Sequence, residues 1–223
     1  MPETHKSKNY IVPPCAEQVE ILLEDESFLL VNKPRPLLSV PGRHPLNKDC
    51  LITRLQKQYP TARIVHRLDM NTSGIMVIAL NTDSHRHLSM QFEQRNTYKE
   101  YVAVVYGVVE EDTGSIELPL ICDWPNRPKQ MVDHQVGKPA LTHFEVLHRG
   151  EDQTRLLFKP LTGRSHQLRV HAAEIGHPIL GCRLYAHPKA LAMSQRLMLH
   201  ASKLEFDHPL SNERVKGFCE VPF

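Results

Sequence analysis

The chain has 223 residues, of which 41% are hydrophobic and 23% charged, a balance typical of a soluble globular protein with one or two domains. Its formal net charge of +2 is too small to indicate a nucleic-acid-binding protein by itself. The five cysteines form no C-x-x-C pair and no apolar run approaches the ~20 residues that span a bilayer, so a disulfide framework, a zinc knuckle and a membrane protein are disfavoured.

The N-terminal residues are polar and lack the apolar segment of a secretory signal. We therefore expect residues 1–18 to form a flexible segment and residues 19–223 to form one domain in the reducing cytoplasm. Within that domain, Val19–Leu23 and Phe28–Val31 are predicted to be two strands of a hairpin around an acidic turn.

Three prolines, Pro34, Pro36 and Pro41, interrupt regular structure until Asp49, which can cap a helix that reaches about Tyr59. The same proline-rich stretch is basic. Its cationic side chains would follow a phosphate backbone if they lined one cleft, and they are Lys33, Arg35, Arg43 and His44.

The stretch 64–80, IVHRLDMNTSGIMVIAL, joins a charged turn to an apolar run. Gly74–Leu80 is predicted to be a strand that is covered on both faces. His66, Arg67 and Asp69 precede small polar residues that favour a tight turn. A carboxylate at the mouth of a rigid strand is well placed for chemistry, although the turn could also serve only to pair the arginine with the aspartate.

Thr82 can cap a helix that runs to about Arg95, and from Thr97 the apolar pattern changes to the period of a strand. The remaining stretches with strand character are Ser115–Leu120, Lys129–His134, Ala140–His148, Thr154–Phe158 and Leu197–Phe206.

A helix over His166–Ile175 can be capped by Thr162 or Ser165, with Gly176 in a left-handed conformation after its end, and a short helix is expected over 188–195. Arg169 would lie on the first turn, where a helix favours a nearby carboxylate or phosphate. Strands outnumber helices without regular alternation. The predicted class is therefore α+β, with a largely antiparallel or mixed sheet flanked by helices and loops.

Residues 66–74 resemble the signature of the RluA family of pseudouridine synthases. Further stretches match that family in the same order, at 31–43, 97–107, 161–181 and 197–206. With 122–130 added, the chain is most similar to a short member of the family that acts on both transfer and ribosomal RNA. The resemblance implies the pseudouridine synthase catalytic fold, an active site in a central cleft, a monomer, and no N-terminal RNA-binding domain of the S4 type.

The family breaks the N-glycosidic bond of a uridine in RNA, turns the uracil and rejoins it through C5, without a cofactor or a metal. The resemblance makes Asp69 the catalytic aspartate, acting on the ribose or the base. Arg169 would pair with Asp69 and lower its pKa. Tyr101 would stack on the uracil or assist departure of the C5 proton, although half-buried packing is the common role of a strand tyrosine.

A stacked uridine must be flipped out of its RNA helix to reach such a pocket. By resemblance, Arg67 occupies the vacated stack, and His66 lies beside the substrate or, more plausibly, orients the turn. Leu168 either closes the apolar side of the pocket or points into the core. In the stretch 122–130, aromatic and basic side chains suited to splayed bases are Trp124, Arg127 and Lys129, with a packing anchor as the alternative for the tryptophan.

The sequence thus predicts an enzyme that isomerises specific uridines in a large-subunit rRNA hairpin and a tRNA anticodon stem-loop. Two alternatives stay open. One is a non-catalytic RNA-binding or RNA-chaperone protein with the same fold, and the other is a metal-free hydrolase that releases uracil. Mapping of pseudouridine in treated RNA separates the three.

Overall fold

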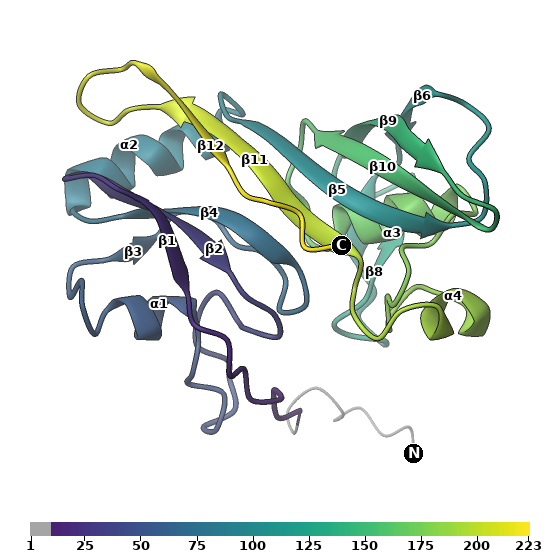
Figure 1. Ribbon diagram of the computed structural model, residues 1–223, viewed down its shortest axis with the longest axis horizontal. Coiled ribbons are helices and arrows are strands. Elements are labelled where there is room, and N and C mark those ends of the chain that lie inside the picture. Colours follow the sequence, from purple (N-terminus) through teal and green to yellow (C-terminus); the bar gives the residue numbers. More distant parts are fainter. Residues whose placement is uncertain (1–9) are drawn as a thin grey trace. The chain divides into compact units, whose positions relative to one another are not determined.

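The computed structural model describes residues 10–223, so the expected flexible segment lies in part outside the described residues (Figure 1). The chain divides into two compact units. The first extends to Lys99 and includes Ala201–Pro222, and the second comprises Glu100–His200 and Phe223. The division falls within two strands, β5 (Tyr98–Tyr106) and β11 (Leu199–Asp207).

The first unit is built on a β-sheet. The pairs β1–β2, β2–β4, β3–β4 and β11–β12 are antiparallel. In spatial order its strands are β1 (Glu20–Glu24), β2 (Phe28–Lys33), β4 (Ser73–Ala79) and β11, with β3 (Arg63–Ile64) beside β4 and β12 (Arg214–Phe218) beside β11. The hairpin β1–β2 and strand β4 confirm the prediction, whereas β3 and β12 were not predicted.

Strand β4 is the buried centre of this unit. All seven of its residues are buried, as the continuous apolar run predicts. Gly74 has a φ of 116°, and a side chain there would collide with the backbone of Ala201. Only glycine allows the backbone at position 74 to lie this close to Ala201 and to adopt this φ, so β4 can begin immediately after the polar turn.

Helix α2 (Thr82–Glu93), labelled in Figure 1, contacts β3 and β4. Its Leu88 is fully buried. The predicted cap was wrong by one residue. The side-chain oxygen of Asn81 accepts a hydrogen bond from the Ser84 amide at 2.8 Å, which makes Asn81 the N-cap instead of Thr82.

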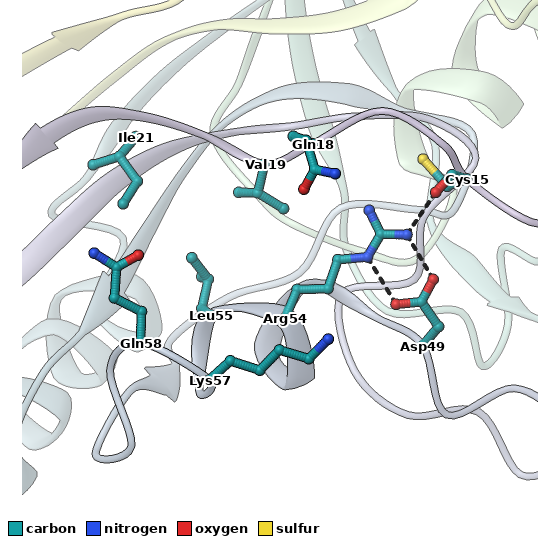
Figure 2. Close-up of a pocket in the computed structure, with 9 residues that line it drawn as sticks. All are labelled: Cys15, Gln18, Val19, Ile21, Asp49, Arg54, Leu55, Lys57 and Gln58. Atoms are coloured by element: carbon teal, nitrogen blue, oxygen red, sulfur yellow. Dashed lines mark hydrogen bonds and ion pairs between the residues drawn. The ribbon is translucent and has the colours of Figure 1, made fainter.

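Helix α1 (Leu51–Leu55) begins after Cys50 and is shorter than predicted. After Leu55 the bonds tighten to three-residue steps: the Lys57 amide donates to the Arg54 carbonyl at 3.4 Å, and the Gln58 amide donates to the Leu55 carbonyl at 3.0 Å. The carboxylate of Asp49 does not cap the helix, because it accepts two hydrogen bonds from Arg54, at 2.7 and 2.6 Å. Figure 2 shows this pair and the bond from Arg54 to the Cys15 carbonyl, 2.7 Å long, which ties the N-terminal segment to α1.

The second unit contains an antiparallel sheet and a separate hairpin. In spatial order the sheet strands are β5, β10 (Gln153–Pro160), β9 (Leu141–Arg149) and β6 (Thr113–Glu117), and the hairpin strands are β7 (Leu120–Cys122) and β8 (Gln130–Val132). The strand predicted over 115–120 is two strands in the structure. Pro119 lies at the break, where it cannot donate a ladder hydrogen bond.

Helix α3 (Gln167–Glu174) supplies Leu168 and Ala172 to a core shared with Ala103, Leu156 and Phe158 of the sheet. Gly176 follows the helix with a φ of 84°, as predicted. Helix α4 (Pro188–Ala192) is shorter than expected. The few short helices and the antiparallel pairs of both units confirm the α+β class.

No helix within residues 10–223 is long and apolar enough to cross a membrane.

Candidate active site

Asp69 lies on the turn between β3 and β4, as the sequence predicts. The turn is closed by a hydrogen bond of 3.1 Å from the Thr72 amide to the Asp69 carbonyl. The side chain of Asp69 is partly buried, whereas Arg67 is exposed. The carboxylate is therefore presented by a short, hydrogen-bonded turn at the start of the buried strand β4.

The proline-rich segment after β2 holds this turn on both sides of Asp69. The hydroxyl of Ser39 donates to the Leu68 carbonyl at 2.8 Å and accepts from the Leu68 amide at 3.2 Å. The Leu37 amide donates to the Met70 carbonyl at 3.0 Å. Because the residues before and after Asp69 are both fixed, the position of its backbone is over-determined.

Lys33 completes this support, and its predicted place on a phosphate-binding surface is wrong. Its side chain is fully buried, and Nζ donates to the carbonyls of Pro34, Leu37 and Met70 at 3.0, 2.8 and 3.3 Å. Burial lowers the pKa of Lys33 to about 7, while the negative charge of Asp69 acts to raise it. Three acceptors match the three N–H groups of the ammonium ion.

His66 holds the start of the turn. Its Nε2 accepts a hydrogen bond from the Val77 amide at 3.1 Å, and its ring stacks on Phe92 with centroids 4.4 Å apart. Burial, assisted by the positive charge of Lys99, lowers the pKa of His66 to about 3. The imidazole is therefore neutral near pH 7, and these contacts favour the orienting role over contact with substrate.

In the second unit, Arg169 lies on the first turn of α3, as predicted, and its amide donates to the His166 carbonyl at 3.0 Å. The predicted caps, Thr162 and Ser165, are wrong: the N-cap is His166, with a φ of 56°. The hydroxyl of Thr162 instead donates to the side-chain oxygen of Gln167 at 2.7 Å, so it bonds a side chain of the first helical residue and not a backbone amide of the helix.

The Arg169 side chain is only 5% exposed. Its Nε donates to the Cys182 sulfur at 3.4 Å, and its guanidinium carbon lies 5.3 Å from the centre of the Tyr185 ring. Leu168, the preceding residue, is 7% exposed and belongs to the core, which agrees with the second of its two predicted roles. Tyr101 is half-buried in β5 opposite Phe158, and its ring packs against the same core.

The loop from Asp123 to Lys129 joins the hairpin strands β7 and β8. Trp124 is 65% exposed, which contradicts a role as packing anchor, and the guanidinium carbon of Arg127 lies 3.2 Å from its ring centre. Asn126 braces the loop through a hydrogen bond of 2.9 Å to the Asp123 carboxylate. The loop presents an aromatic and cationic surface of the kind that stacks on unpaired bases.

Among residues 10–223, no three His, Cys, Asp or Glu side chains gather closely enough to hold a metal ion.

Comparison with known proteins identifies the family. Its sequence model, described as RNA pseudouridylate synthase, matches residues 27–174, which include the turn of Asp69 and the whole of α3. The chain belongs to this RNA pseudouridylate synthase family. It is therefore an RNA-modifying isomerase, as the motifs predict.

Individual relatives of the synthase extend the match over nearly the whole chain. Dual-specificity RNA pseudouridine synthase RluA of Yersinia pestis is 52% identical over 204 residues, 91% of this chain and 99% of that protein. The protein of the same name from Escherichia coli is 53% identical and covers 88% of this chain and 90% of its own. The solved structure of human RNA pseudouridylate synthase domain containing 1 has a TM-score of 0.78 at 30% identity, covering 96% of this chain and 87% of its own.

The synthase carries its predicted site residues in both units. Arg67, His66 and Asp69 belong to the first unit, and the second contains Tyr101, Trp124, Arg127, Lys129, Leu168 and Arg169. The pairing of Asp69 with Arg169 stays a prediction. Sequence reasoning missed the supporting residues Lys33, Ser39 and Tyr185, because their importance lies in contacts between segments that are distant in sequence.

Proposed function

We propose that this synthase isomerises specific uridines in two classes of RNA, a large-subunit rRNA hairpin and a tRNA anticodon stem-loop. The observation that supports it is the identity of 52% and 53%, over about nine-tenths of the chain, to two enzymes whose names state dual specificity. The enzyme acts as a monomer in the cytoplasm and needs no metal or cofactor.

Asp69 begins the reaction, either at the ribose or at the uracil of the target uridine. The Ser39 and Lys33 contacts described above fix the backbone on each side of Asp69. Such preorganisation matters because the carboxylate must meet one atom of a flipped nucleotide, and misplacement by about 1 Å can slow a reaction roughly 100-fold.

Arg169 supplies a positive charge to the Asp69 carboxylate and holds its oxygen atoms through the planar guanidinium group. Tyr101 stacks its ring on the flipped uracil, and its hydroxyl assists departure of the C5 proton after C5 has joined the ribose. Neither residue changes its covalent bonds in the net reaction, since the uracil moves from N1 to C5 linkage within one nucleotide.

Arg67 fills the space that the flipped uridine leaves in the RNA stack. Its exposed guanidinium group, two residues before Asp69, is suited to stack between bases. Trp124 and Arg127 bind a second, unpaired base outside the pocket. Flipping costs roughly a few kcal/mol, which favours targets in loops over targets in uninterrupted helices.

The test is pseudouridine mapping by carbodiimide modification and primer extension, on an anticodon stem-loop and an rRNA hairpin incubated with the purified protein. The proposal expects pseudouridine at one defined uridine in each RNA, and none in matched RNAs with cytidine at that position. Modification of one RNA class alone would contradict dual specificity. RNA binding without modification would indicate the chaperone alternative, and free uracil the hydrolase.

A further inference from the structure

Tyr185 lies between three parts of the second unit that the proposed function uses: the β7–β8 hairpin, the start of α3, and the side chain of Arg169. Its ring packs against the core that contains Leu168 and against a second cluster formed by Leu120, Ala140 and Val170. Its backbone amide donates to the Cys182 carbonyl at 3.3 Å, in the turn that follows Gly181. Tyr185 is therefore a fixed side chain on a short, hydrogen-bonded turn.

The hydroxyl of Tyr185 joins the hairpin to helix α3. It accepts a hydrogen bond from the Gln130 amide at 2.8 Å and lies 2.6 Å from Nδ1 of His166. Gln130 is the first residue of β8, immediately after the loop that carries Trp124 and Arg127. Because the Gln130 N–H occupies one lone pair of the phenol oxygen, the phenol proton can be donated to His166.

The ring of Tyr185 and the adjacent turn also hold Arg169. The guanidinium carbon of Arg169 lies 5.3 Å from the ring centre, within the range of a cation–π contact. Cys182, three residues earlier, accepts a hydrogen bond of 3.4 Å from Arg169 Nε. The His166 carbonyl accepts from the Arg169 amide, so the residue that bonds the hydroxyl of Tyr185 also bonds the backbone of Arg169.

We propose that Tyr185 is a positioning residue that couples the Trp124 loop to Arg169, so that RNA held by the loop meets a correctly oriented guanidinium group. The inference rests on the proposed roles of the loop in binding RNA and of Arg169 in the reaction. The hydroxyl acts on the loop through Gln130, and the ring acts on Arg169.

Two substitutions separate these contacts. Tyr185→Phe removes the hydroxyl and keeps the ring, so it should raise the KM for the RNA hairpin about 5-fold, as expected for loss of one hydrogen bond, with kcat within about twofold of wild type. Tyr185→Leu removes the ring as well and should lower kcat by a further ~10-fold and shift the acidic limb of the pH–rate profile upward. Tyr59→Phe is the matched control, because it removes a tyrosine hydroxyl that bonds Glu24 at 2.6 Å in the first unit.

A double-mutant cycle tests the coupling itself. Once Trp124→Ala has raised KM by removing the stacking ring, Tyr185→Phe should have no further effect on KM. An undiminished effect in that background, a wild-type KM for Tyr185→Phe, or a wild-type KM for Trp124→Ala would each overturn the proposal.

A measurement on the free protein separates this proposal from the proposed function. Trp124 is the single tryptophan of the chain, so its fluorescence reports on the loop alone. Tyr185→Phe should increase quenching of that fluorescence by acrylamide at least ~1.5-fold, since the loop loses its anchor at Gln130. Unchanged quenching in Tyr185→Phe would overturn the anchoring role of Tyr185, even if the wild-type protein modifies RNA. Increased quenching in Tyr185→Phe, together with a wild-type protein that does not modify RNA, would refute the proposed function and leave the anchoring role intact.

Discussion

At the scale of single residues, the turn of Asp69 depends on two polar side chains that form hydrogen bonds within the first unit. The ammonium group of Lys33 donates to three carbonyls, one of which belongs to Met70 beside Asp69. The imidazole of His66 accepts from the Val77 amide in β4. The hydrogen bonds of these two side chains hold the turn that carries Asp69 in one conformation.

Lys33→Met should lower the rate of pseudouridine formation at least ~10-fold, because the turn beside Asp69 loses its donors while the side-chain volume is almost unchanged. Its unfolding free energy should change by less than about 2 kcal/mol, since loss of the hydrogen bonds is opposed by removal of a buried charge. Single-turnover kinetics and urea unfolding measure the two effects. Lys57→Met, at an exposed lysine of the same unit, is the control, and a wild-type rate for Lys33→Met would remove the turn-holding role.

The depressed pKa of His66 predicts a pH-dependent stability. The folded pKa is about 3 and the ordinary value is 6.5, so between these values the unfolded chain binds a proton that the folded chain excludes. The stabilising contribution is complete above about pH 6.5 and is lost as the pH falls toward 3.

The unfolding free energy of wild type, measured with urea, should therefore fall between about pH 7 and about pH 5. In His66→Leu this fall should be smaller by about 1–2 kcal/mol. His148→Leu, at an exposed histidine, is the control and should follow wild type. Equal losses in His66→Leu and wild type would mean that His66 does not resist protonation.

At the scale of secondary-structure elements, α2 offers a direct test of a cap that the structure moved by one residue. Asn81→Ala should lower the unfolding free energy by about 1 kcal/mol, because it removes the acceptor of the Ser84 amide. Thr82→Ala, at the cap predicted from sequence, should have an effect below about 0.5 kcal/mol. Urea titration of both variants checks this, and the reverse order of effects would restore Thr82 as the cap.

Sequence patterns predicted the elements with strong periodicity and missed those fixed by long-range contacts. Strand β4 was predicted because seven consecutive buried residues leave a continuous apolar run. Strand β3 has only two residues and is specified by pairing with β4, so no local pattern marks it. The left-handed cap at His166 escaped prediction because its side chain is held by the hydroxyl of Tyr185, which lies far along the chain, and no local pattern marks that contact.

For the candidate site, the sequence predicted which residues take part but not the contacts that hold them in place. Asp69 and Arg169 were selected by resemblance to the family, and the structure places each on the predicted turn and helix start. Lys33 was assigned to a charged surface because a sequence does not reveal that three carbonyls surround its ammonium group. Local charge alone therefore misassigned a buried structural cation.

At the scale of the whole molecule, the proposed reaction draws on both units, since Asp69 belongs to the first and Arg169 to the second. Arg169→Lys should lose activity about 100-fold, although it keeps the charge, because an ammonium group cannot hold a carboxylate through a planar fork. Arg169→Met also removes the positive charge and should move the acidic limb of the pH–rate profile upward. The assay is single-turnover rate against pH on one RNA hairpin, and an unmoved acidic limb would show that the two residues do not act as partners.

The role of Asp69 is the central claim, and Asp69→Asn tests it most directly because the change removes charge with almost no change in volume. The measurement is single-turnover pseudouridine formation in one anticodon stem-loop, with RNA affinity and unfolding free energy measured on the same samples. We predict a rate at least ~1000-fold below wild type, with affinity within about threefold and stability within about 1 kcal/mol. A variant that still forms pseudouridine at more than about a tenth of the wild-type rate would contradict Asp69 as the catalytic residue.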